Sequence, residues 1–138
     1  MTALVVDASV IAPFLIADEA GDRSERLMEA LLSGGAVAPQ HWRLEVGNLG
    51  RKAVRHGRIT PQELFEGIAL LATLPVHIDS QTDELAWSRI LDLSSEHDLT
   101  TYDAAYLELA RRTGLPLASV DSALMRASES MSVSLFRL

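Results

Sequence analysis

Short apolar runs alternate along the chain with longer stretches in which apolar residues recur every three or four positions. The runs are mostly continuous and rich in valine, leucine and alanine. Continuous runs of this kind are typical of strands that are buried in a parallel sheet. Five of them can be read from the sequence, at residues 3–6, 36–38, 75–79, 117–120 and 133–136.

The stretches between these runs predict helices whose ends are marked by glycine, proline and capping residues. The clearest start is Thr60, where Pro61 stands in the first turn and Glu63 completes a capping box. Glycines at positions 34–35, 57 and 114 predict helix ends. The predicted helices cover about residues 21–32, 40–56, 60–74, 86–93 and 100–113, with a short one after residue 121.

Strands that are separated by helices imply βαβ units. We therefore predict an α/β fold, a three-layer α/β/α sandwich with a central parallel sheet of four to five strands. The 138 residues correspond to about one domain, so residues 1–138 are expected to form a single unit. Apolar residues make up 48% of the chain, which indicates a globular protein.

Composition excludes several classes of function. The chain has no cysteine, which rules out disulfides, thiolate zinc sites and cysteine nucleophiles. No apolar run approaches the roughly 20 residues that a membrane span needs, and the N-terminus lacks a basic leader region. We expect a cytoplasmic protein without a membrane segment. The net charge of −7 argues against non-specific coating of DNA, although a nuclease needs only a local positive patch.

Three aspartates stand at positions where a parallel sheet places its ligands. Asp7 directly follows the first predicted strand, Asp121 follows a later one, and Asp103 lies in the first turn of a predicted helix. Ligands bind outside the carboxyl ends of parallel strands. Helix capping explains each aspartate when it is taken alone. Together on one edge they would raise one another's pKa, and a divalent cation with its preference for oxygen would relieve that repulsion.

Glu45 is a fourth candidate, and capping does not explain it because it lies in mid-helix. It sits at the edge of an apolar arc, so it is either a solvated helix residue or a carboxylate that reaches into a cleft. Four carboxylates suffice to bind one or two Mg²⁺ ions, with Mn²⁺ as an alternative. Such ions polarise a phosphoryl oxygen and activate water, so a phosphodiester could be cut without a nucleophilic side chain. The apolar arc consists of Trp42, Val46, Leu49 and Ala53.

Five of the twelve cationic side chains fall within residues 43–58. This concentration could hold phosphates beside the metal, although a solvated helix face is an equal alternative. Asp18 and Glu19 are interpreted as solvated loop residues, and Trp42 and Trp87 as packing residues. The cations are Arg43, Arg51, Lys52, Arg55 and Arg58.

Four segments together resemble the PIN-domain family, and specifically the VapC-like toxins of type II toxin–antitoxin pairs. The segments are residues 5–9 (Val-Val-Asp-Ala-Ser), 44–48 (Leu-Glu-Val-Gly-Asn), 99–110 with the motif Tyr-Asp-Ala-Ala-Tyr, and 117–121 (Leu-Ala-Ser-Val-Asp). The resemblance covers essentially the whole chain, and the tyrosine-containing motif is its most specific part. It implies that Asp7, Glu45, Asp103 and Asp121 are the catalytic, metal-binding quartet, with Asp7 and Asp103 as the best-supported ligands.

The resemblance also assigns polar positions around the quartet. Ser9 matches a hydroxyl next to the first acid, and Asn48 matches a polar residue one turn beyond Glu45. Ser119 stands where the family commonly has threonine, and the hydroxyl is retained. Arg51, Lys52 and Arg55 are then candidates for substrate or antitoxin contacts. The family resemblance further implies an RNA substrate, a homodimer and inhibition by an antitoxin.

Two other classes of function fit part of the pattern. A phosphohydrolase with an aspartyl nucleophile would also place Asp7 after the first strand, but it usually has a second acid where this chain has Ser9. A non-catalytic PIN-like module that binds RNA or a partner would have no need of four clustered acids. The leading hypothesis is therefore a Mg²⁺-dependent endoribonuclease toxin.

Overall fold

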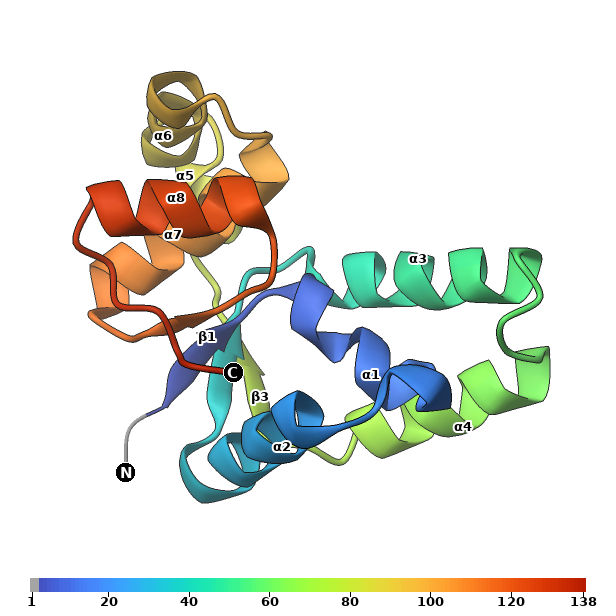
Figure 1. Ribbon diagram of the computed structural model, residues 1–138. Helices are drawn as coiled ribbons and strands as arrows, with labels where there is room; N and C mark the ends of the chain where they lie inside the picture. The colour runs from blue at the N-terminus through green and yellow to red at the C-terminus, as the bar shows by residue number, and fades with distance from the viewer. Residues whose placement is uncertain (1–2) are drawn as a thin grey trace.

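The computed structural model describes residues 3–138 and contains a parallel sheet of four strands (Figure 1). The strand order is β3-β2-β1-β4, and every pairing is parallel. In the register, Val5 lies opposite both Val37 and Leu117. The predicted parallel sheet is confirmed. Its strands are β1 (Leu4–Val6), β2 (Ala36–Ala38), β3 (Val76–Ile78) and β4 (Leu117–Ala118).

The fifth predicted strand, at residues 133–136, does not form as a strand. Leu135 makes a single parallel bridge to Leu117. The Leu117 amide donates to the Ser134 carbonyl at 2.8 Å, and the Phe136 amide donates to the Leu117 carbonyl at 2.8 Å. The reason is the shortness of β4, which ends at Ala118 and so offers only two residues for pairing.

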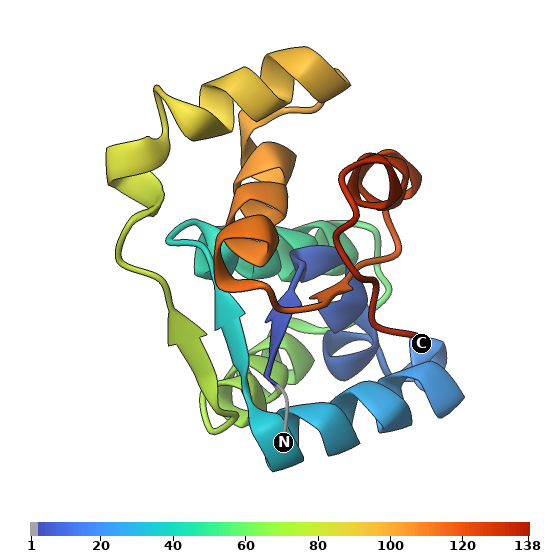
Figure 2. The ribbon, with the colours of Figure 1, turned by 90° about the vertical axis from the view of Figure 1, so that its left-hand side faces the viewer.

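Helices cover both faces of the sheet, which confirms the three-layer α/β/α prediction. Figures 1 and 2 show α7 with α6 and α8 on one face and α1 to α4 on the other. Helices α3 and α4 form a hairpin that extends away from the sheet (Figure 1). The larger helices are α2 (Asp22–Gly34), α3 (Trp42–Arg55), α4 (Pro61–Leu71), α6 (Arg89–His97), α7 (Thr101–Thr113) and α8 (Ser122–Ser130). The short ones are η1 (Ala8–Ile11), α1 (Ala12–Leu15), η2 (Ala17–Glu19) and α5 (Thr82–Leu85).

The capping box predicted at the start of α4 is present. The Glu63 amide donates to the Thr60 hydroxyl at 3.0 Å, and the Thr60 amide donates to the Glu63 carboxylate at 2.9 Å. By contrast, the helix predicted through residues 86–93 is divided into α5 and α6 by a turn. Trp87 stands in this turn and is 92% exposed, so its interpretation as a packing residue is wrong. Trp42 is buried as predicted.

The hydrophobic core fixes the two elements that carry the candidate site. All of β1 is buried, and in α7 every residue from Ala104 to Ala110 is buried between the sheet and its neighbouring helices. Burial of apolar surface on this scale holds β1 and α7 in one relative position. In the described part of the chain, no helix is both long enough and apolar enough to span a membrane.

One acid at the carboxyl edge of the sheet is neutralised by an arginine. Asp79 directly follows β3, and Arg112 on α7 donates to both of its carboxylate oxygens, at 3.2 and 2.8 Å. Arg112 also binds Glu108, whose side chain is buried, at 2.8 and 3.1 Å. This cluster joins α7 to the end of β3. At this edge of the sheet, the charge of Asp79 is therefore balanced by the guanidinium group of Arg112.

Candidate metal and nuclease site

Asp7 follows β1 and is held from two sides by hydroxyl groups. The Ser9 hydroxyl donates to Asp7 Oδ2 at 2.6 Å, and the Ser119 hydroxyl donates to the same oxygen at 2.8 Å. These two bonds fix the orientation of the carboxylate. Among residues 3–138, no hydrogen bond reaches the other oxygen, Oδ1. Asp7 is only 4% exposed, and its Oδ1 is left without a protein donor.

The serine that follows β4 links two of the candidate acids. Besides its bond to Asp7, the Ser119 hydroxyl accepts from the Asp121 amide at 3.0 Å. Asp121 caps α8, because its carboxylate accepts from the Leu124 amide at 2.8 Å. The capping interpretation of Asp121 is therefore correct, and its Oδ2 is occupied by that bond.

Glu45 is half-buried and lies in the first turn of α3, so the prediction that it stands in mid-helix is wrong. It has two partners. The Tyr106 hydroxyl of α7 donates to Glu45 Oε1 at 2.5 Å, and His41 Nε2 lies 3.3 Å from the same oxygen. Burial raises the pKa of Glu45, but these hydrogen bonds and the charge of a protonated His41 outweigh burial and lower it overall. Glu45 thus contacts α7 through Tyr106, although its side chain is 32% exposed.

Asp103 lies in the first turn of α7, where the Thr100 hydroxyl caps the helix by accepting from the Asp103 amide at 3.1 Å. Its carboxylate has no Lys or Arg partner within the described residues. Burial, followed by the charges of Asp121, Asp7 and Glu45, raises the pKa of Asp103 to about 6. Burial also raises the pKa of Asp7, and Glu45 and Asp121 add to that rise against the two serine hydroxyls.

These pKa shifts bring the four acids into one electrostatic group. Each acid acts on at least one other, although they come from β1, α3, α7 and the turn before α8. Burial is the largest cause of the raised pKa values of Asp7 and Asp103, and repulsion from the neighbouring carboxylates adds to it. Asp79 at the same edge differs, because Arg112 neutralises it.

The donor set suits a hard divalent cation, since it consists of carboxylate oxygens with a surplus of negative charge. As the side chains stand, no group of three or more His, Asp or Glu residues within residues 3–138 is close enough to hold a metal. The carboxylates of Asp7, Glu45 and Asp121 are each turned toward hydrogen-bond donors of the protein. Mutual repulsion favours this separation in the absence of a cation.

The basic stretch of α3 is only partly available for ligands. Arg51, Lys52 and Arg55 are exposed and have no ion pair within the described residues, and Asn48 is exposed one turn beyond Glu45. Arg58 differs, because it binds Asp18 at 3.1 Å and Glu19 at 2.6 Å. Asp18 and Glu19 are exposed, as their interpretation as solvated residues predicts, and their ion pairs with Arg58 are contacts that the sequence did not predict.

Sequence reasoning assigned no role in the site to Tyr106 or His41. Tyr106 is fully buried and supplies the shortest hydrogen bond to Glu45. Its spacing gives a usable signal, because residues three apart on a helix share a face, and Tyr106 is three residues after Asp103. His41 precedes Glu45 by four residues, which is also a same-face spacing.

Comparison with known proteins gives one family. The sequence profile of the PIN domain matches residues 4–129. The protein Ribonuclease VapC3 of Pyrobaculum aerophilum is 30% identical over 125 residues, which cover 86% of this chain and 88% of that protein. Two solved structures share the fold. PAE2754 from Pyrobaculum aerophilum has a TM-score of 0.64 at 22% identity, covering 91% of this chain and 84% of its own. VapC20 of Mycobacterium tuberculosis, described as a sarcin-ricin loop cleaving toxin, has a TM-score of 0.61 at 19% identity, covering 91% and 95%.

Proposed function

This chain belongs to the PIN domain family, and on that premise we propose that it is a Mg²⁺-dependent endoribonuclease that serves as the toxin of a toxin–antitoxin pair. Asp7, Glu45, Asp103 and Asp121 form its catalytic, metal-binding quartet, with Mn²⁺ as an alternative ion. The relative named Ribonuclease VapC3 supports RNA as the substrate. Cleavage of RNA would place its action in the cytoplasm.

The observation that carries this proposal is that three acids of the quartet lack a Lys or Arg partner within the described residues. Asp7, Asp103 and Asp121 have no Lys or Arg partner within the described residues, whereas Asp79 at the same sheet edge is bound by Arg112. A fold that neutralises one acid at this edge and leaves three without such a partner, each close enough to affect another's pKa, is destabilised by their repulsion. Binding of a divalent cation would relieve this repulsion, and the free energy so gained would add to the affinity for the ion.

The remaining side chains have orienting roles in this proposal. A bound divalent cation supplies Lewis-acid polarisation of the phosphoryl oxygen and a water of lowered pKa. Ser9 and Ser119 hold Asp7 so that Oδ1 stays open, and Tyr106 and His41 hold Glu45. Arg51, Lys52 and Arg55 are placed to contact the RNA backbone or an acidic part of the antitoxin, with Asn48 between them and the quartet.

Large exposed apolar side chains support a role in protein association. Leu44, Phe65 and Trp87 are 78%, 70% and 92% exposed. Exposed apolar groups of this size often mark surfaces that bind other proteins. We propose that such surfaces serve a homodimer and the antitoxin. A homodimer would have twice the 15.0 kDa chain mass in light scattering, and a monomer at all concentrations would contradict that part of the proposal.

The central experiment measures cleavage of a labelled RNA by wild type and Asp7→Asn, with and without Mg²⁺. We expect wild type to cleave only with the ion, and Asp7→Asn to lose at least about 100-fold in rate, since one ligand of a charge-stabilising site is removed. Asp83→Asn, an exposed acid outside the quartet, is the matched control. Equal cleavage by wild type and Asp7→Asn would show that the assigned site is wrong.

The same preparations test the two other classes of function. An aspartyl-phosphate phosphohydrolase would acquire a phosphate on Asp7 during turnover, detectable as a mass increase. The structure weighs against this class, because the position two residues after Asp7 is Ser9 and its hydroxyl occupies Asp7 Oδ2. A non-catalytic module would bind RNA and leave it intact at every metal concentration.

A further inference from the structure

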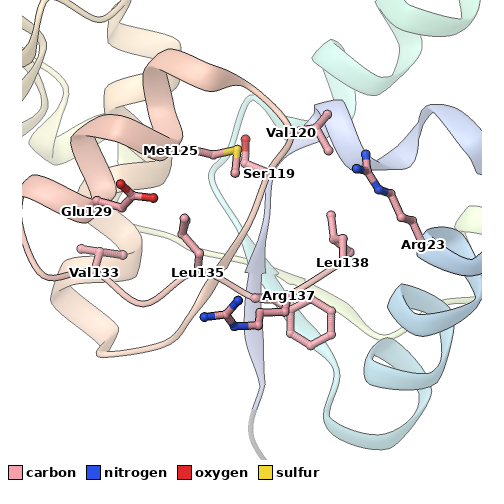
Figure 3. Close-up of a pocket in the computed structure, with 10 residues that line it drawn as sticks. Arg23, Ser119, Val120, Met125, Glu129, Val133, Leu135, Arg137 and Leu138 are labelled. Atoms are coloured by element: carbon pink, nitrogen blue, oxygen red, sulfur yellow. The ribbon is translucent and has the colours of Figure 1, made fainter.

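A groove runs beside Asp7 between α8 and α2, over the last residues of the chain. Figure 3 shows its lining, with Met125 and Glu129 on the α8 side, Arg23 of α2 on the other, and Arg137 and Leu138 along the chain end. Its volume is about 670 Å³, which falls within the range of small-molecule sites. None of the four quartet acids lines it.

The groove continues into a second hollow of about 280 Å³ on the other side of Val120. Arg23, Val120 and Leu138 line both hollows. Ser119 lines the first hollow, and Ser9 lines the second. Val120 therefore lies where the two hollows meet, and Arg23 borders both of them.

Both hollows end on the hydroxyls that hold Asp7. Ser119 and Ser9 donate to Asp7 Oδ2, and the Val120 amide donates to the Ser9 hydroxyl at 3.1 Å. The groove is thus lined by two serines that are hydrogen-bonded to Asp7, a proposed metal ligand. A polymer cut at the quartet would have its neighbouring units within reach of this groove.

Two arginines and one acidic side chain, Glu129, line the larger hollow, and the arginines are the groups that could bind an anion. Arg23 and Arg137 are exposed, and neither has an ion pair or a side-chain hydrogen bond in the described part of the chain. Glu19, which lines the hollow beside Arg23, is already bound by Arg58. In Figure 3 the Arg23 side chain extends toward Val120. Unpaired arginines beside a site for phosphodiester cleavage are suited to phosphate contacts.

The groove also has an apolar floor. Val120 is 46% exposed, and Met125 and Leu138 line the same space. Nucleobases stack on apolar and aromatic surfaces, and single strands are bound by a combination of stacking and backbone charge contacts. An arginine next to an apolar floor therefore matches a single-stranded nucleotide better than it matches a free anion.

We propose that this groove is an RNA subsite next to the scissile phosphate, in which Arg23 binds a backbone phosphate and the floor around Val120 receives a base. This inference rests on the proposed ribonuclease function. It differs from the basic stretch of α3. Arg51 to Arg55 lie about 9–15 Å along the helix from Glu45, on a hairpin that points away from the sheet (Figure 1).

The experiment compares Arg23→Ala with Arg26→Ala. Arg26 is exposed one turn further along α2 and lines neither hollow, so it matches the loss of charge. Binding of a fluorescent 12-nucleotide RNA is measured by anisotropy at several salt concentrations in an Asp7→Asn background, which prevents cleavage. We expect Arg23→Ala to weaken binding about tenfold and to reduce the salt slope by about 0.7, the value for one phosphate contact on a single strand.

Kinetics in the wild-type background separate binding from chemistry. Arg23→Ala is expected to raise KM for RNA with little change in kcat, and Arg23→Lys to restore part of the loss. The Arg23→Ala/Arg137→Ala double variant would show whether a second contact adds to the slope change. Melting temperatures of these variants should equal that of wild type, since both arginines are exposed.

Two results would overturn the subsite. One is that Arg23→Ala and Arg26→Ala give the same affinity and salt slope. The other is that Arg23→Ala leaves RNA binding intact and weakens only the inhibition by a protein partner, which would assign the groove to that partner. If wild type fails to cleave RNA while Arg23→Ala still reduces RNA affinity and slope, the failure belongs to the proposed catalytic function and not to the groove.

Discussion

Replacing Asp103 with asparagine tests whether the quartet is a strained group of charges. The substitution removes one negative charge and keeps the size and most of the polarity of the side chain. In the metal-free protein at pH 7.5, we expect Asp103→Asn to be more stable than wild type. The reason is that burial, and after it the charges of Asp121, Asp7 and Glu45, oppose ionisation of Asp103.

The magnitude follows from the pKa of Asp103, which rises from 3.8 to about 6 on folding. A carboxyl with a raised pKa stabilises the folded state while it is protonated. That contribution is complete below about pH 4 and is lost as the pH rises through 6. The full shift corresponds to about 3 kcal/mol. Because Asp103 is only half-buried, solvent screening reduces the expected effect to about 1 kcal/mol.

The assay is urea denaturation followed by circular dichroism, in EDTA, at pH 4 and pH 7.5. The free energy of unfolding of Asp103→Asn minus that of wild type should increase by about 1 kcal/mol between the two pH values. Asp83→Asn controls for the change in net charge, because Asp83 is exposed. Excess Mg²⁺ should reverse the order, stabilising wild type by roughly 2.7 kcal/mol at 100 times the dissociation constant and Asp103→Asn much less.

A difference between the variants that does not change with pH would refute this reasoning, because electrostatic repulsion must follow ionisation. A pH-dependent difference of the opposite sign would mean that Asp103 has a cationic partner in solution. If Mg²⁺ stabilised both proteins equally, Asp103 would not be a ligand, although the repulsion could still be real.

Three further substitutions test one support of the site and two ion-pair clusters of the fold. Tyr106→Phe removes the hydroxyl bond to Glu45, so it should raise the pKa of Glu45 and cost about 1 kcal/mol in unfolding free energy. The acid limb of the pH–rate profile should shift upward, and an unchanged profile would contradict this role of Tyr106. Arg112→Ala should cost about 3 kcal/mol by thermal denaturation, since buried Glu108 would lose its cation, and a loss below about 1 kcal/mol would remove the cluster as a determinant of stability. Arg58→Ala should leave thermal stability close to that of wild type in the same assay, because exposed ion pairs contribute little, and a marked loss of stability would contradict this.

Local signals in the sequence were sufficient for most of the elements. The apolar runs at the start of the chain and before Pro39 predicted β1 and β2, and the capping box at Thr60 predicted the start of α4. These signals are reliable because they are local. A capping box involves residues three positions apart, and apolar residues recur with different spacing in helices and in strands. The placement of Asp7 at the carboxyl edge also follows from sequence, since a residue directly after a parallel strand has no other place to lie.

Several predictions failed where pairing over long separations decided the outcome. Residues 133–136 have a composition suited to a strand, yet β4 was too short to pair with them. Trp87 has a spacing suited to the core, yet the turn between α5 and α6 leaves it exposed. Asp18 and Glu19 are exposed as predicted, but their pairing with Arg58 was not predicted, because only the position of the α3–α4 connection brings Arg58 to them.

The sequence by itself determined the fold class and which acids are candidates, because strand runs, helix caps and strand-end positions are local properties. Tertiary structure decided how those acids are held. Ser119 reaches Asp7 across 112 positions, and Tyr106 reaches Glu45 across 61. It also decided that Asp79 is neutralised while Asp103 is not, since an ion pair depends on where the packed core of α7 places Arg112. The distances between such residues are set by the packing of β1 and α7 into one core, so local sequence patterns carry no information on them.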